Sequence, residues 1–199
     1  MRLYTHSHCP FAQRAVVALQ LAKLRYESIE VDLYGPGVKA YKHINPKGLV
    51  PALVLENDRN RVIPESEDIL DFIDTDLLDP PASPDGVLQK LGDTDKAQRL
   101  WYKEQTDILL KEGRVCYPYA SKRMVQTLQE IDARLYGPFA AKCGLSIIDC
   151  SLFPFVWRIE REFGSVLETK TPRLYRWLDT MGAHEAVQRT LSSGYWMWW

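Results

Sequence analysis

The sequence places one cysteine where a thiol would be chemically active. Cys9 directly precedes Pro10, at the point where a short strand ends and a helix with an apolar face begins. A thiol at a helix N-terminus faces unpaired backbone N–H groups and the positive end of the helix dipole. Both effects stabilise thiolate over thiol, so the sequence predicts a lowered pKa and a reactive sulfur at Cys9. A buried structural cysteine is the competing interpretation of this position taken by itself.

The position three residues after Cys9 decides between one-thiol and two-thiol chemistry. It is Ala12, so a redox cycle between two neighbouring cysteines is unavailable. The spacing of the other cysteines forms neither a paired metal motif nor a small disulfide scaffold. We therefore expect no metal site, a reducing cytoplasmic setting, and packing roles for Cys116, Cys143 and Cys150.

Two further segments have residue types suited to holding a ligand. Residues 48–51 place a proline before an apolar strand, and a cis bond there would point the Val50 N–H and C=O outward to pair with an extended peptide. Glu65 and Ser66 lie at a strand-to-helix junction, where Ser66 would bind a carboxylate and Glu65 an adjacent ammonium group. A trans-proline turn and a plain N-cap are the alternatives when each segment is considered alone.

The elements that must position these residues form an α/β domain over residues 1–78. The helix between the first two strands favours a parallel pair, and the tight turn between the last two favours an antiparallel pair. The sequence therefore predicts a mixed four-stranded sheet with helices. Strands are expected at residues 2–6, 26–32, 51–55 and 61–63, and helices from Pro10, after residue 37, and from Ser66 to about Asp76.

The rest of the chain shows only helical patterns. Residues 79–93 read as a linker rich in proline, and residues 94–199 as an all-α domain. Ser146 and Asp149 have the spacing of a capping box, which starts a helix. Pro154 should break one hydrogen bond of that helix and kink it. The aromatic side chains at 195–199 either line an acceptor pocket or pack in the interior.

Composition and charge exclude several classes of function. The chain has 25 basic and 26 acidic residues, which leaves a net charge of −1 and no basic stripe for nucleic acid. No apolar run is long enough to span a membrane, and the first residues lack the apolar core of a secretory signal. We therefore expect a cytoplasmic protein without nucleic-acid or membrane partners.

Together these segments resemble the glutathione S-transferase superfamily over nearly the whole chain. Residues 9–12 (CPFA) are similar to the active-site motif of its cysteine-type classes, omega and lambda. Residues 45–51 (NPKGLVP) resemble the family's cis-proline segment. Residues 65–66 are similar to its γ-glutamyl-binding pair, and residues 145–150 to the helix start of its second domain. The two-domain bacterial glutaredoxin is also similar at 64–74 and 151–154, but it carries two active-site cysteines where this chain has Ala12.

The resemblance implies a fold and a division of labour. The fold is a thioredoxin-like N-terminal domain followed by an all-α C-terminal domain. Cys9 would form a mixed disulfide with glutathione, the co-substrate, and reduce or deglutathionylate a small disulfide or electrophilic acceptor. A non-catalytic binding or regulatory protein and glutathione conjugation to electrophiles are the alternatives, and monomer and homodimer both stay open. Glutathione would be held by Phe11, Lys39, Leu49, Val50, Pro51, Glu65 and Ser66.

Overall fold

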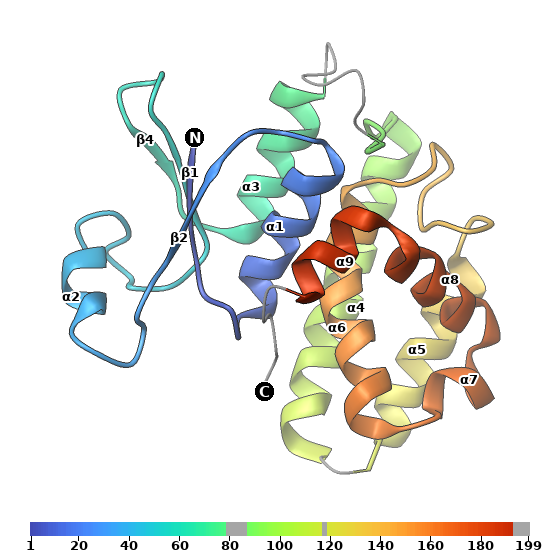
Figure 1. The fold of residues 1–199 in the computed structure, drawn as a ribbon. Helices are drawn as coiled ribbons and strands as arrows, with labels where there is room; N and C mark the ends of the chain where they lie inside the picture. The colour runs from blue at the N-terminus through green and yellow to red at the C-terminus, as the bar shows by residue number, and fades with distance from the viewer. Residues whose placement is uncertain (79–86, 117–118, 193–199) are drawn as a thin grey trace. The chain divides into compact units, whose positions relative to one another are not determined.

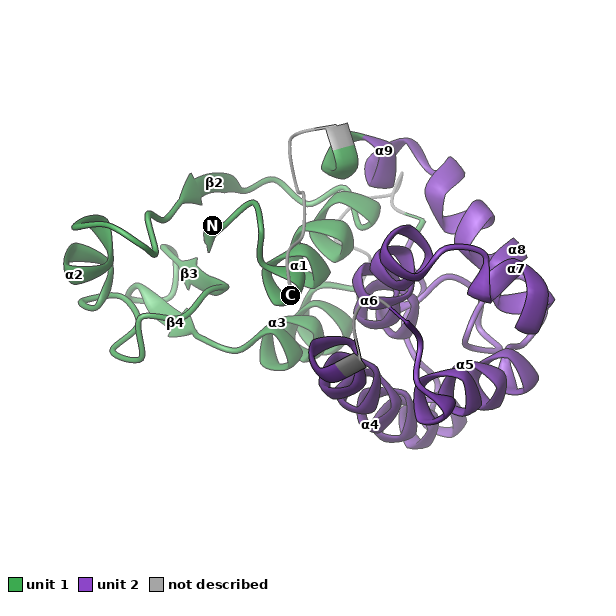
Figure 2. Ribbon diagram, turned by 90° about the horizontal axis from the view of Figure 1, so that it is seen from below, with its two compact units in different colours: residues 1–87, 189–198 green, residues 88–188, 199 purple. Residues whose placement is uncertain are grey.

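The computed structural model describes residues 1–78, 87–116 and 119–192, which divide into two compact units (Figure 2). Among the described residues, one unit contains residues 1–78, 87 and 189–192, and the other contains residues 88–116 and 119–188. The linker predicted at 79–93 falls mostly outside the described residues, and its described part before Asp93 is loop. The sequence places residues 189–192 in the helical domain, whereas here they group with the first unit.

In the described part of the first unit, a four-stranded mixed sheet is joined to helices (Figure 1). The strand order is β2-β1-β3-β4, in which β1 and β2 are parallel and the other neighbours antiparallel, as the sequence predicts. The elements are β1 (Arg2–Thr5), α1 (Pro10–Leu21), β2 (Glu27–Glu30), α2 (Gly37–Tyr41), β3 (Ala52–Leu55), β4 (Arg61–Ile63), α3 (Ser66–Phe72) and the π-helical turn η1 (Ile73–Leu77).

The core of the first unit lies between the sheet and two helices. Helices α1 and α3 pack side by side, while α2 lies away from them beyond the sheet (Figure 1). Strand β3 pairs with β1 on one side and β4 on the other, and it is buried along its whole length. Around Ala12, Val31, Tyr41, Val50 and Ala52 a separate apolar cluster forms, and Cys9 packs against it.

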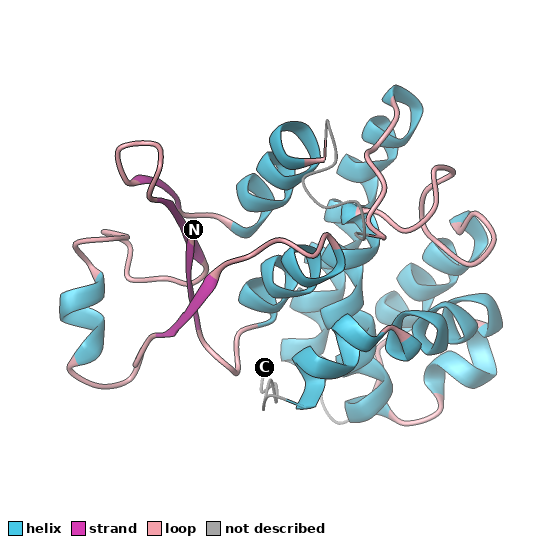
Figure 3. Ribbon diagram, turned by 45° about the horizontal axis from the view of Figure 1, so that its top comes forward, coloured by secondary structure: helices cyan, strands magenta, loops and turns pink. Residues whose placement is uncertain are grey.

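The regular secondary structure in the described part of the second unit is helical apart from isolated bridges, so the all-α prediction is confirmed (Figure 3). No described helix is both long and apolar enough to cross a membrane. The sequence missed two short helices, α7 and α9. The helices are α4 (Asp93–Cys116), α5 (Lys122–Arg134), α6 (Ile147–Phe163), α7 (Val166–Lys170), α8 (Pro172–Ala183) and α9 (Glu185–Ser192), the last of which spans the boundary between the units.

Helix α6 begins at the predicted capping box. Ser146 Oγ accepts from the Ile148 N–H at 3.3 Å, and Asp149 Oδ2 accepts from the Ser146 N–H at 2.9 Å. The helix remains continuous through Pro154, although proline removes one backbone donor. Its neighbours Phe153 and Phe155 are fully buried, so side-chain packing holds the helical conformation around the proline.

Candidate functional site

Cys9 occupies the N-cap position of α1. Its backbone is extended, and Pro10 takes the first helical position, where a missing N–H breaks no helical bond. The Cys9 carbonyl accepts the first helical hydrogen bond from the Gln13 N–H at 3.0 Å. The thiol lies 3.6 Å from the main-chain oxygen of Val50, to which it donates. The sulfur is therefore held between the start of α1 and the loop before β3.

The surroundings of Cys9 raise its pKa, so the predicted lowering is wrong. Burial is the largest cause, because it removes the water that would solvate a thiolate. The backbone N–H groups of Ala12 and Phe11 and the positive charge of Arg14 lower the pKa, but they do not outweigh burial. The helix N-terminus thus limits the effect of burial instead of producing an acidic thiol.

The other cysteines with described side chains have less favourable surroundings for a thiolate. Burial raises the pKa of Cys143 to about 11, and the Asp95 carboxylate adds to the shift. Cys150 is fully buried beside Asp149, and its pKa is raised well above the usual range. Among these three thiols, only that of Cys9 has a cation among the causes that lower its pKa.

The loop before β3 is fixed by side-chain hydrogen bonds to its backbone. Asn45 Nδ2 and the Tyr41 hydroxyl both donate to the Leu49 carbonyl, at 2.7 and 2.8 Å. Asn45 Oδ1 accepts from the Lys47 N–H at 3.1 Å. The Val50–Pro51 peptide bond is cis. The Leu49 side chain is 59% exposed, whereas Val50 is buried with its carbonyl toward Cys9.

The N-terminus of α3 differs by one residue from the prediction. Glu65 is the N-cap residue, with extended backbone, and Ser66 is the first helical residue. Ser66 is buried, and its hydroxyl lies 3.5 Å from Arg14 Nη1. Its N–H belongs to the first helical turn, where backbone donors have no partner within the helix. This end of α3 therefore retains the features of an anion-binding position.

Sequence reasoning missed the lysine that lies beside Glu65. Lys47 Nζ is 2.6 Å from Glu65 Oε1, and both side chains are exposed. Lys39, the lysine predicted to contact glutathione, is exposed on α2. The sequence could have indicated Lys47, because this lysine lies inside the segment at residues 45–51, which ends at the proline before β3.

Arg14 is a second residue that sequence reasoning missed. Its side chain is 2% exposed, although arginine is rarely buried without a partner. The guanidinium lies over the Phe11 ring, 5.3 Å from its centroid, and Nη1 lies 2.7 Å from Glu67 Oε1. The signal in the sequence was a charged residue between Phe11 and Ala18 on the otherwise apolar stripe of α1.

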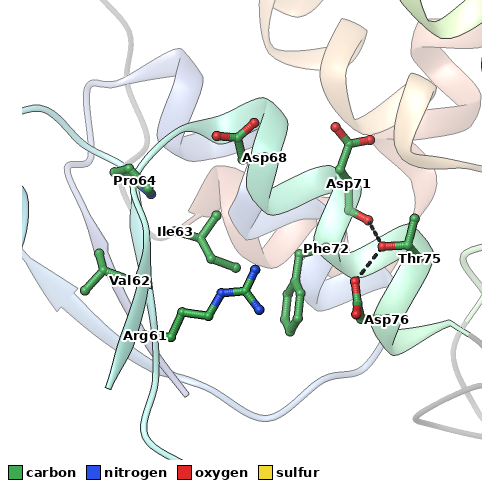
Figure 4. A pocket seen from close by; sticks show the side chains of 9 residues that line it. All are labelled: Arg61, Val62, Ile63, Pro64, Asp68, Asp71, Phe72, Thr75 and Asp76. Carbon is green, nitrogen blue, oxygen red and sulfur yellow. Dashed lines mark hydrogen bonds between the residues drawn. The ribbon is translucent and has the colours of Figure 1, made fainter. Parts of the chain in front are cut away.

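A groove of about 360 Å³ lies elsewhere on the first unit, between β4 and the α3–η1 segment (Figure 4). The Arg61 guanidinium lies beside the Phe72 ring, 5.9 Å from its centroid, and Asp68, Asp71 and Asp76 are the acidic residues of the lining. No candidate site residue lines it, and among the described residues no group of three metal-ligating side chains occurs. The groove is lined by Arg61, Val62, Ile63, Pro64, Asp68, Asp71, Phe72, Thr75 and Asp76.

Comparison with known sequences links this site to one family. Residues 8–76 match the family model of the glutathione S-transferase N-terminal domain. Glutathione S-transferase omega-1 of Rattus norvegicus is 27% identical over 91% of this chain and 76% of its own length. Glutathione S-transferase L2, chloroplastic, of Arabidopsis thaliana is 27% identical over 95% of this chain and 65% of its own length. The matched region of the family model contains Cys9, the loop before β3 and the start of α3.

Solved structures share the fold over both units. Glutathione transferase Omega 3C from Trametes versicolor superposes with a TM-score of 0.78 at 22% identity, covering 95% of this chain and 87% of its own. Ure2p in complex with glutathione superposes with a TM-score of 0.77 at 19% identity, covering 96% of this chain and 93% of its own. The thioredoxin-like domain and all-α domain predicted from the sequence are thereby confirmed as the fold.

Proposed function

We propose that this chain, whose residues 8–76 match the glutathione S-transferase N-terminal domain, is a member of that superfamily and a glutathione-dependent thiol transferase or reductase with Cys9 as its nucleophile. The observation that carries the proposal is the position of the Cys9 sulfur at the start of α1, in contact with the Val50 carbonyl. The Thr5 hydroxyl is a less suitable nucleophile, because Thr5 is buried within β1.

In this proposal glutathione binds along the loop before β3 and the start of α3. Its γ-glutamyl carboxylate is bound by the Ser66 N–H, and its ammonium group by Glu65. Its backbone pairs with Val50 as a strand would. Lys47 is better placed than Lys39 to meet a glutathione carboxylate, because it already lies against Glu65. Phe11, Leu49 and Pro51 complete the proposed contacts.

The proposed reaction exchanges one disulfide for another in two steps. The Cys9 thiolate attacks the glutathione sulfur of a glutathionylated acceptor, the S–S bond breaks, and the acceptor leaves as a thiolate that takes a proton from water. A second glutathione thiolate then attacks the Cys9–glutathione disulfide, releasing Cys9 and oxidised glutathione. Two electrons pass from glutathione to the acceptor. Because the pKa of Cys9 is raised, loss of its proton precedes attack.

The test is glutathione-dependent reduction of a mixed disulfide between glutathione and a small thiol. Cys9→Ser should lower the rate at least ~100-fold, since an alcohol is a far weaker nucleophile than a thiolate. Cys143→Ser is the matched control and should leave the rate unchanged. Equal rates for wild type and Cys9→Ser would contradict the proposal.

The same proteins distinguish the alternatives. Retention on immobilised glutathione without turnover would favour a binding or regulatory protein. Strong turnover of an aromatic halide by Cys9→Ser would favour conjugation of electrophiles. The cytoplasmic setting is part of the proposal, although one similar plant protein is named as chloroplastic. The small disulfide or electrophilic acceptor also stays a prediction, and monomer and homodimer both stay open.

A further inference from the structure

Arg14 connects the two helix N-termini of the candidate site. It lies on α1, five positions after Cys9, and its guanidinium reaches α3. Nη1 lies 2.7 Å from Glu67 Oε1 and 3.5 Å from the Ser66 hydroxyl. Helices α1 and α3 pack against each other, so this contact joins the helix that carries the thiol to the helix that carries the proposed anion position.

Burial makes this charge pair stronger than a surface ion pair. The Arg14 side chain is 2% exposed and that of Glu67 is 18% exposed. Charges in such surroundings are poorly screened by water and salt, so each acts on its neighbours over several ångströms. Arg14 lowers the pKa of Cys9, and it is the one charged side chain among the causes of that thiol's shift. Glu67, as its partner, offsets part of that positive charge.

Other titratable groups lie near Cys9, but none of them is among the causes of the shift in its pKa. Burial raises the pKa of Tyr41 to about 12, which keeps its hydroxyl neutral at physiological pH. His6 Nδ1 lies 3.0 Å from Glu30 Oε1, which places a carboxylate beside this ring. The titratable side chains of the preceding strand, its loop and the apolar cluster, besides Cys9 itself, are those of Arg2, Tyr4, His6, His8 and Tyr41.

We propose that Arg14 is a positioning residue for both halves of the site: it orients the Ser66 hydroxyl by direct contact and supplies a buried positive charge on the helix that begins after Cys9, which Glu67 partly neutralises. The importance of this role for catalysis rests on the proposed function. Its effect on the thiol, however, is a property of the unliganded protein. Arg14 acts on the site through its contact with Ser66 and through its charge, which lowers the pKa of Cys9.

The charge effect can be tested with variants that move it in opposite directions. The measurement is the rate of Cys9 alkylation by iodoacetamide against pH, followed by peptide mass spectrometry. Arg14→Gln should raise the pH midpoint by about 0.5 unit or more, a roughly threefold loss of thiolate at fixed pH below the midpoint. Glu67→Gln should lower the midpoint, and Arg14→Lys should stay near wild type. Arg25→Gln, at an exposed arginine, is the matched control.

The opposite signs separate electrostatics from damage to the fold. Midpoints that shift in the same direction in Arg14→Gln and Glu67→Gln, or that do not shift, would overturn the inference. Circular dichroism and thermal unfolding check each variant. If Arg14→Gln does not fold, Glu67→Gln decides the matter, because it removes a charge with almost no change in shape; an unchanged midpoint would then overturn the inference.

The effect on Ser66 has its own readout. The dissociation constant of S-methylglutathione, which has no free thiol, should rise about tenfold in Arg14→Gln, as expected when a hydrogen-bonded charged contact is lost. An unchanged constant would overturn the positioning of Ser66. If wild type does not bind S-methylglutathione, the proposed function fails, while the alkylation profiles still decide whether Arg14 acts on Cys9.

Discussion

The Sγ atom of Cys9 lies 3.6 Å from the main-chain oxygen of Val50, although 41 positions separate the two residues in the sequence. Only a protonated thiol can donate to that carbonyl, so this contact favours the neutral form of Cys9, as burial does. The carbonyl is also the proposed partner of the glutathione backbone. A ligand that takes this acceptor would compete with the thiol and so favour its ionisation.

Cys9 should be alkylated before Cys143 and Cys150, at a rate that rises with pH into the alkaline range. Its raised pKa means that the thiolate fraction increases about tenfold per pH unit below the midpoint. Cys143, with a pKa of about 11, and the fully buried Cys150 should follow. Limited alkylation at pH ~8 with peptide mapping checks this order, and earlier labelling of Cys143 would refute it.

Oxidised glutathione should convert the protein to a stable Cys9–glutathione adduct. Ala12 offers no second thiol one helical turn away, so the adduct must wait for free glutathione. Intact-mass analysis should show one added glutathionyl group, lost on adding glutathione and absent in Cys9→Ser. Ala12→Cys should replace the adduct with an internal disulfide. Formation of an internal disulfide by the wild type would mean that another cysteine lies near the site.

Lys47→Ala should weaken glutathione binding about tenfold, whereas Lys39→Ala should change it less than twofold. Lys47 pairs with Glu65 beside the start of α3, and a charge-assisted contact to a ligand carboxylate is worth roughly that factor. Isothermal titration with S-methylglutathione measures both variants. Similar losses of affinity in the two variants, or a larger loss for Lys39→Ala, would contradict the assignment of the carboxylate contact to Lys47.

Asp149→Ala should lower the free energy of unfolding by about 3 kcal/mol or more. The buried carboxylate accepts from Trp177 Nε1 at 2.8 Å, the Ala140 N–H at 2.8 Å and the Ser146 N–H at 2.9 Å. Removing it leaves these buried donors without their acceptor. Urea denaturation measures the change, with Asp107→Ala on exposed α4 surface as the control, expected within about 0.5 kcal/mol. A loss as small as the control's would show that the donors find other acceptors.

The sequence by itself determined the features that depend on near neighbours in the chain. Periodicity and turns predicted the order of strands and helices and the parallel and antiparallel pairs of the first unit. The start of α1 at Pro10 and the capping box of Ser146 and Asp149 were readable because each needs only residues a few positions apart. The short helices α7 and α9 escaped, because a single turn or two gives little periodicity.

The tertiary structure decided the properties that depend on residues far apart. The pKa of Cys9 follows from how deeply the fold buries the sulfur, which outweighs the helix N-terminus that the sequence displays. Arg14 meets Glu67 across 53 positions, and Lys47 meets Glu65 across 18, so neither pair has a local pattern. Solvation and charge balance are summed over everything that packs around a group, and only the folded chain specifies that sum.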